Sequence, residues 1–179
     1  KTAIGSIKRI EEQTDGKQMS ISSYRYSGDR TVLSYEEMNG YCNRAIKLNP
    51  NCKLTLILMQ VNDIEDYMKN EGSGFVQDLL QSVQDTVRRH VGHRGIVCPL
   101  QPNLMSVVVQ DINSDIKLRA FIESLRSRIA WNYRLIDPKY EISFSFGVAC
   151  YPENGMDMRI VHRKLVKALQ MAQEKHANC

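Results

Sequence analysis

The 179-residue sequence lacks the features that mark disulfide-rich, zinc-bound or membrane-spanning proteins. Its five cysteines are odd in number and widely spaced, without a Cys-x-x-Cys pair, so neither a disulfide framework nor a zinc site is predicted. No apolar run approaches the roughly 18 residues that a membrane span needs. The first residues carry no signal-peptide pattern. These absences indicate a reducing compartment, and we expect a cytoplasmic location.

The composition that is present is ordinary for one globular domain with a short extension. The chain is 42% hydrophobic and 25% charged, with a formal net charge of +4. A chain of this length buries roughly 70% of the surface that its unfolded form exposes, so it needs no metal or disulfide to hold a core. The sequence begins at Lys1 without a methionine, and we expect it to be a piece of a longer protein.

The chain divides into a polar beginning and a patterned remainder. Residues 1–33 are weakly periodic, with glycines among Ser, Thr, Asp and Lys, which predicts a linker or the tail of a preceding domain. Residues 34–179 are expected to form one domain. It opens with Ser34 and Glu37 at capping-box spacing, which predicts a helix that ends near Asn49.

Four segments have the pattern of strands. Residues 54–59 form a nearly continuous apolar run, typical of a strand covered on both faces. Residues 95–99 and 104–110 flank a Pro-Asn turn and predict a hairpin. Residues 141–150 alternate strictly between large apolar and small side chains. We expect Gly147, on the small-residue face, to let another element approach closely.

Helices are predicted between and after the strands. A short helix ends at Gly72, and a second one begins at Ser73 and stops at Gly92. A third is expected to be capped by Asp115 and the last one by Asp157. The side chains expected to face inward on these two helices are Ile116, Phe121, Ile122, Leu125 and Ile129, and Ile160, Val161, Leu165, Leu169 and Ala172. The order of elements predicts an α+β fold with a mainly antiparallel, five-stranded or nearly five-stranded sheet flanked by helices.

Several short motifs follow one another between Leu54 and Asn178. They are Gly72, Leu79-Leu80, the strand Ser145-Phe146-Gly147-Val148-Ala149 followed by Tyr151-Pro152 and Gly155, and the helical positions Ala168-Leu169, Ala172 and Asn178. Together these motifs resemble the GGDEF domain family, which contains the diguanylate cyclases and their inactive relatives. The resemblance implies a nucleotide-cyclase fold with a ferredoxin-like palm core.

The same resemblance locates the positions at which the family has functional residues and this chain has others. Gln60 and Asn62 stand at two positions that are acidic in the family. Met68 and Gln77 stand at its guanine-contacting positions. The signature is replaced by Gln101-Pro102-Asn103-Leu104-Met105, and the lysine of the last helix by Gln173. The Arg-x-x-Asp inhibition motif is replaced by residues 92–95, Gly-His-Arg-Gly. The resemblance therefore implies a degenerate site with no catalytic residue, no bound metal and no cofactor.

The chemistry of the cyclase reaction supports this interpretation. Joining two GTP molecules needs magnesium to neutralise the triphosphates, and proteins hold magnesium through carboxylates. Gln60, Asn103 and Leu104 supply no negative charge, so the main electrostatic contribution to phosphoryl transfer is absent. Asp63 and Glu65 are nearby carboxylates that could replace the lost ligands. We favour the alternative that they stabilise a helix N-terminus.

The densest basic cluster contains Arg88, Arg89 and Arg94, which are candidate contacts for an anion. A phosphate, an acidic partner and nucleic acid are the ligand classes considered for it. The cluster lies at a predicted helix C-terminus and has no interleaved aromatic residues. We therefore favour a solvated helix end and expect no direct nucleic-acid binding.

Isolated histidines and aromatic residues on the helices are given structural interpretations. His162 and His176 have no acidic or cysteine partner at metal-ligand spacing, and we expect them on the surface. Trp131 and Tyr133 follow an inward-facing stripe and are expected to pack against the core.

The sequence therefore predicts a non-enzymatic regulatory module of a larger bacterial multidomain signalling protein, acting in relay or dimerisation. Its expected partners are neighbouring domains of the same polypeptide or a second copy. One alternative is a ligand-sensing domain that binds GTP or cyclic di-GMP and controls a neighbouring output domain. Another is an active diguanylate cyclase with a rearranged metal site. Nucleotide titration separates the first two hypotheses, and product analysis tests the third.

Overall fold

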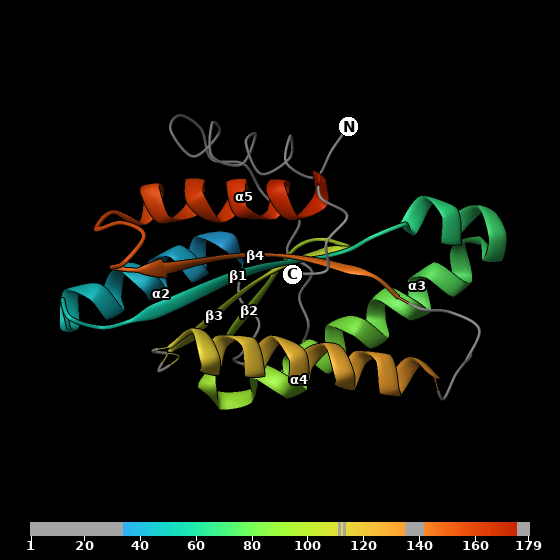
Figure 1. The fold of residues 1–179 in the computed structure, drawn as a ribbon, viewed down its shortest axis with the longest axis horizontal. Coiled ribbons are helices and arrows are strands. Elements are labelled where there is room, and N and C mark those ends of the chain that lie inside the picture. Colours follow the sequence, from blue (N-terminus) through green and yellow to red (C-terminus); the bar gives the residue numbers. More distant parts are fainter. Residues whose placement is uncertain (1–33, 111, 113, 135–141, 175–179) are drawn as a thin grey trace.

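The computed structural model describes residues 34–110, 112, 114–134 and 142–174 (Figure 1). The strands are β1 (Leu54–Val61), β2 (Gly95–Gln101), β3 (Leu104–Gln110) and β4 (Phe144–Tyr151). The helices are α2 (Tyr35–Leu48), α3 (Ile64–Val91), the short 3-10 turn η1 (Gly92–Arg94), α4 (Asp115–Arg134) and α5 (Met158–Glu174). The predicted α+β class is confirmed, with four strands in the described residues where five were expected. The predicted linker, residues 1–33, lies outside the described residues.

All pairs of neighbouring strands are antiparallel, in the order β2-β3-β1-β4. The central strand β1 pairs with β3 on one side and with β4 on the other. Each side chain from Leu54 to Met59 is at most 2% exposed. The prediction of a strand covered on both faces is therefore confirmed.

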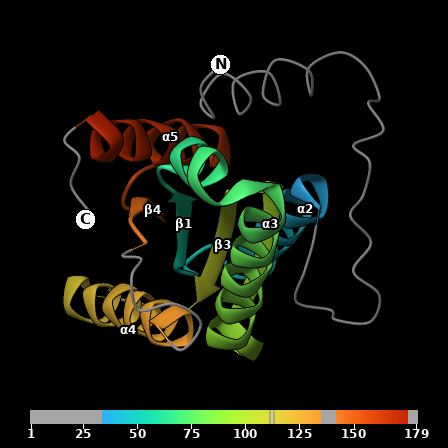
Figure 2. The ribbon, with the colours of Figure 1, turned by 90° about the vertical axis from the view of Figure 1, so that its right-hand side faces the viewer.

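Two helices cover each face of the sheet. Figure 2 shows α5 and α4 on opposite sides of the strands. Ile57 and Met59 pack in a core shared with α3 and α4, whereas Leu56 and Leu58 pack in a second core shared with α2 and α5. This division follows from the two-residue period of a strand, because successive side chains point to opposite faces.

The helix N-termini are fixed by local hydrogen bonds. At α2, the Ser34 hydroxyl accepts from the Glu37 amide at 3.2 Å and the Glu37 carboxylate accepts from the Ser34 amide at 2.8 Å, which confirms the capping box. Asp157 accepts from the Arg159 amide at 2.8 Å at the beginning of α5, as predicted. The prediction for α4 is wrong by one residue. Ser114, not Asp115, is the cap, because its hydroxyl accepts from the Lys117 amide at 3.3 Å.

Two boundaries show how the backbone departs from the simplest pattern. Gly72 has φ 85° and ψ 175° and separates α3 into two segments, as the predicted pair of helices required. The hairpin is confirmed, although β2 extends beyond the predicted end at Pro99 because Gln101 still pairs with Leu104. Pro102 and Asn103 alone form the turn.

Three apolar side chains expected to face inward are exposed instead. Ile116 is 81%, Trp131 68% and Ile160 38% exposed. A helix turns about 100° per residue, so Trp131 lies about 200° around α4 from the buried Ile129. These residues continue an apolar pattern in the sequence, but their side chains lie off the buried face of the helix. The side chain of Tyr133 lies outside the described residues.

Gly147 marks the closest approach between β4 and α5. A Cβ atom at this position would lie 2.5 Å from the Leu169 amide nitrogen and 2.7 Å from the Leu165 carbonyl oxygen. Both atoms belong to backbone, which cannot move aside as a side chain would. The expectation that Gly147 serves packing is therefore confirmed.

We predict that Gly147→Val lowers the free energy of unfolding by about 2 kcal/mol or more, because α5 must move away from the sheet. Thermal denaturation should show a fall in Tm of at least about 4 °C. Gly74→Val is the matched control, since a Cβ there meets no atom within 4 Å. Equal Tm values for the two variants would contradict the packing role.

Candidate functional site

The positions that resemble the cyclase site meet at one end of the sheet. Gln60, near the end of β1, pairs with Leu104 of β3 and with Ser145 of β4. The β2–β3 turn lies beside it, since the Val61 amide donates to the Asn103 carbonyl oxygen at 2.9 Å. The side chain of Gln173 reaches the same place from α5. The sheet thus brings residues more than a hundred positions apart into one polar site.

The central contact of this site joins two neutral amides. Nε2 of Gln173 donates a hydrogen bond to Oε1 of Gln60 at 2.5 Å, and both residues are partly buried. This contact joins one donor and one acceptor and carries no net charge. At these two positions the family resemblance implies an aspartate and a lysine, so a neutral pair stands where an acid and a base are expected.

Asn62 and Asp63 are held by the beginning of β4 and the residue before it. The Ser145 hydroxyl donates to Oδ1 of Asn62 at 3.1 Å, and the Ser143 hydroxyl donates to Oδ2 of Asp63 at 3.0 Å. Asp63 occupies the N-cap position of α3 in a left-handed conformation with φ 57°, but its side chain makes no capping hydrogen bond. Both predicted acids therefore lie at the N-terminus of α3, where the carboxylate of Asp63 accepts from Ser143 and makes no capping hydrogen bond. Glu65 is exposed in the first turn of α3.

The signature positions belong to the turn and to the core. Nδ2 of Asn103 donates to the Val61 carbonyl oxygen at 3.3 Å, and Nε2 of Gln84 donates to the Pro102 carbonyl oxygen at 3.2 Å. Gln101 is partly buried beside them. Leu104 and Met105 are both 0% exposed and pack in the two cores. Leu104 has no atom that can ligate a cation, and the thioether sulfur of Met105 is not an oxygen ligand of the kind that magnesium prefers.

The guanine-contacting positions implied by the resemblance lie on α3, on either side of the Gly72 break. Met68 is 43% exposed and Gln77 is also exposed. Within the described part of the chain, no hydrogen bond connects either side chain to the polar site. Among the same described residues, no group of three His, Cys, Asp or Glu side chains is arranged to hold a metal ion.

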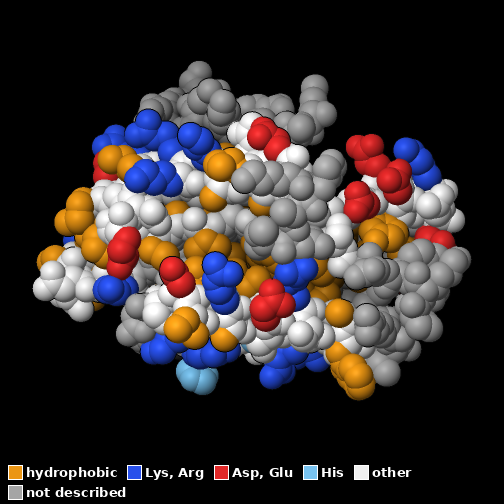
Figure 3. All heavy atoms as spheres, viewed as in Figure 1, with side chains coloured by type: hydrophobic (Ala, Val, Ile, Leu, Met, Phe, Trp, Pro, Cys, Tyr) orange, Lys and Arg blue, Asp and Glu red, His pale blue; other side chains and the backbone are white. Residues whose placement is uncertain are grey.

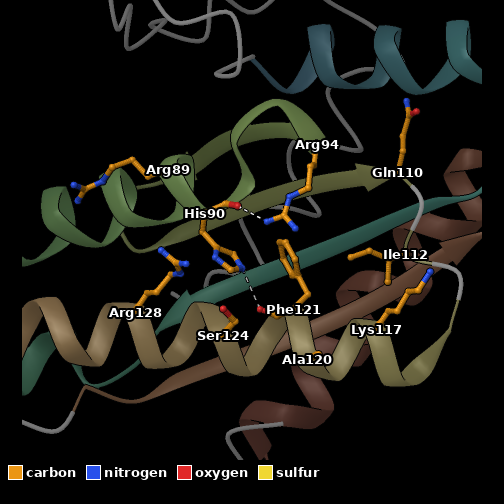
Figure 4. Close-up of a pocket in the computed structure, with 10 residues that line it drawn as sticks. All are labelled: Arg89, His90, Arg94, Gln110, Ile112, Lys117, Ala120, Phe121, Ser124 and Arg128. Atoms are coloured by element: carbon orange, nitrogen blue, oxygen red, sulfur yellow. Dashed lines mark hydrogen bonds between the residues drawn. The ribbon is translucent and has the colours of Figure 1, made fainter.

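The basic cluster lies where the sequence predicted, at the C-terminal end of α3 and in η1. Arg88 pairs with the Asp85 carboxylate at 3.2 Å, and Nε of Arg89 donates to the Asp85 carbonyl oxygen at 3.2 Å. A guanidinium nitrogen of Arg94 donates to the His90 carbonyl oxygen at 2.7 Å. The interpretation as a simple solvated helix end is incomplete. Arg89 and Arg94 line a cavity of about 630 Å³ between α3 and α4 (Figure 4).

One histidine that the sequence placed on the surface is buried. His162, expected on the surface, is 7% exposed, and its Nδ1 shares a 2.9 Å hydrogen bond with the Tyr35 hydroxyl of α2. Burial lowers the pKa of His162 to about 4. The signal was its helical spacing from Leu165 and Leu169, which places it on the inward side of α5. The other expected surface histidine, His176, lies outside the described residues.

The surface of the molecule is basic over two helices. On the face shown in Figure 3, Lys and Arg side chains gather over α5 and along α4. No helix among the described residues is both long enough and apolar enough to span a membrane.

Comparisons with known structures agree with this architecture. The GGDEF domain of YfiN (also called TpbB) from Pseudomonas aeruginosa is 12% identical, with a TM-score of 0.68 over 82% of this chain and 88% of that one. The active GGEEF domain of a diguanylate cyclase from Vibrio cholerae is 13% identical, with a TM-score of 0.69 over 83% and 95%. The GGDEF domain of DgcB from Caulobacter crescentus, solved in complex with c-di-GMP, is 12% identical, with a TM-score of 0.65 over 86% and 96%.

At these identities the structural matches show a shared fold and nothing about shared chemistry. A search of curated proteins found no match to the chain. The family model described as "Diguanylate cyclase, GGDEF domain" matches residues 35–179, which is most of the sequence and includes every element from α2 to α5. The chain therefore belongs to the GGDEF domain family.

Proposed function

We propose that this domain is a catalytically inactive GGDEF module of a larger cytoplasmic, multidomain bacterial signalling protein, where it acts in relay or dimerisation. The observation that carries the proposal is the hydrogen bond between Gln60 and Gln173. It fills the polar site with neutral groups that are already paired. The Gln60–Gln173 pair itself contributes no charge with which to bind a metal–triphosphate complex.

The donor set does not fit the magnesium that the family implies. Magnesium keeps several waters and is bound through carboxylates, since charge must offset its costly dehydration. Oε1 of Gln60 is engaged by Gln173, and Leu104 presents only hydrocarbon. Asp63 is the one carboxylate that the described contacts bring into the network, and a single carboxylate is a poor substitute for the missing ligands.

The proposed relay role is supported by the position of α2. This helix follows residues 1–33 in the sequence and buries Met38 and Cys42 against the sheet. Tyr35 in its first turn contacts His162 of α5 through the hydrogen bond and an edge-on ring contact with centroids 5.6 Å apart. A displacement of the preceding segment would therefore reach both β2 and α5 through α2.

The first test is product formation. We predict that the full chain makes no cyclic di-GMP from GTP with magnesium or manganese, because the carboxylates are absent. Chromatography of a long incubation measures this, with the active GGEEF domain from Vibrio cholerae as positive control. Gln60→Asp should also be inactive, since the missing groups act as a unit. Product that disappears in Asp63→Asn would favour the rearranged-site alternative instead.

The second test is nucleotide binding. We predict that a large excess of GTP or cyclic di-GMP leaves the Tm unchanged within about 1 °C, because Met68 offers no donor or acceptor for a guanine edge. Binding at 100 times Kd would stabilise the fold by about 2.7 kcal/mol and raise the Tm by several degrees. A shift that is specific for GTP and absent in Gln77→Ala would support the ligand-sensing alternative.

The third test measures the polar site itself. A double-mutant cycle on Gln60→Ala and Gln173→Ala should give a coupling of about 0.5–1.5 kcal/mol in urea denaturation, as expected for one partly buried hydrogen bond. The exposed pair Gln170 and Glu174, joined at 3.2 Å on the same helix, is the control and should couple by at most about 0.5 kcal/mol. A coupling near zero at Gln60 would show that the two amides do not hold each other.

A further inference from the structure

We propose that the basic cavity between α3 and α4 is a docking site for an extended, acidic peptide segment of a partner protein. This inference goes beyond the proposed function, because the cavity lies away from the polar site. Gln110, which lines the cavity, pairs with Leu54 at the beginning of β1, whereas Leu104 pairs with Gln60 near its end. Six residues of extended strand separate these two positions, which is about 20 Å.

The cations of the cavity are the first argument. Arg89 and Arg94 come from the end of α3 and from η1, and Lys117 and Arg128 come from α4 (Figure 4). Within the described ranges of the chain, none of these four side chains forms an ion pair, and none of the lining residues is a carboxylate. Like charges held around one hollow attract anions strongly. The lining therefore leaves its positive charge available to a ligand.

The spacing of the cations indicates an elongated ligand. Lys117 and Arg128 are eleven residues apart, which is close to three turns of helix, so they lie on the same face of α4 and about 16 Å apart along its axis. Figure 4 shows them on either side of Phe121. One phosphate group or one carboxylate cannot reach both. An extended peptide places alternate side chains about 7 Å apart, so three acidic residues cover this distance.

The interior of the cavity favours a peptide over a nucleotide. The guanidinium of Arg94 lies 5.6 Å from the centroid of the Phe121 ring, and the His90 ring lies 4.7 Å from it. Arg94 and His90 thus already lie against the Phe121 ring, so a nucleotide base could stack on this ring only by displacing one of them. Nε2 of His90 is also engaged, since it donates to the Phe121 carbonyl oxygen at 3.2 Å. The remaining floor, Ile112 and Ala120, suits an apolar peptide side chain between the acidic ones.

His90 adds little charge of its own to the cavity. Burial lowers the pKa of His90, and the charges of Arg94 and Arg128 lower it further against the opposing hydrogen bond to Phe121. The imidazole is thus neutral at pH 7, and the field in the cavity comes from arginine and lysine.

The test uses the full chain and a fluorescein-labelled eight-residue peptide in which Glu alternates with Ser. Fluorescence anisotropy should show saturable binding that weakens as salt is raised, and a peptide with Gln in place of Glu should bind at least about tenfold more weakly. The double variant Lys117→Gln with Arg128→Gln changes two exposed side chains of α4 and leaves Arg94 in contact with Phe121. We expect it to lose at least about fivefold in affinity while keeping the Tm.

The matched control is Lys164→Gln with Lys167→Gln, which removes the same charge from exposed positions of α5. It should bind the peptide within about twofold of the unchanged chain. Equal losses in the two double variants would overturn the proposal, because net charge alone would then explain binding.

Displacement of the peptide by pyrophosphate at a similar concentration would assign the cavity to small anions. Tighter binding of an eight-nucleotide oligouridylate, lost in the α4 variant, would assign it to nucleic acid. Neither result depends on whether the chain makes cyclic di-GMP.

Discussion

The fold depends on the burial of β1 on both of its faces. Leu54 to Met59 cannot be exposed on either side, so the strand needs helices above and below it and a partner strand at each edge. Hydrophobic burial of this kind contributes about 1.5–3 kcal/mol for each large side chain. The alternation of side chains along β1 then assigns α3 and α4 to one core and α2 and α5 to the other. The two ends of the same strand provide the polar site and the basic cavity.

The polar site pairs its amide side chains with neutral groups of the same domain. Buried polar atoms are costly unless they find partners, and a buried charge is more costly still. Gln60 with Gln173, and Asn62 with Ser145, give each amide a neutral partner within the domain. At a neighbouring position, the side chain of Leu104 is buried in the core. Each of these hydrogen bonds joins two groups of the domain itself.

The features that the sequence predicted are those determined by nearby residues. The capping box of Ser34 and Glu37 operates within four positions, and the hairpin turn within two. The alternation that placed Gly147 against another element is also local. The orientation of Ile116 and Trp131 depends on which side of α4 the sheet covers, whereas the spacing of His162 from Leu165 and Leu169 already indicated the buried side of α5.

The two sites differ in how much of each the sequence revealed. Family motifs located the residues of the polar site, but the pairing of Gln60 with Gln173 connects elements 113 positions apart and needed the folded chain. The sequence indicated only part of the basic cavity. Arg89 and Arg94 are close together in the sequence and were recognised as a basic cluster, whereas Lys117 and Arg128 belong to a different helix. A cluster that draws on two helices has no signature in one stretch of sequence.

The two buried imidazoles give the domain a dependence on acidity that its surface does not suggest. His90 lies between α3 and α4, and His162 lies between α5 and α2, so each helical layer contains one. The folded pKa of His162, about 4, lies below the value of about 6.5 expected for the unfolded chain. Its contribution to stability is therefore complete above pH 6.5 and is lost as the pH falls toward 4. The pKa of His90 is lowered as well, so acid weakens the packing of the helices on both faces of the sheet.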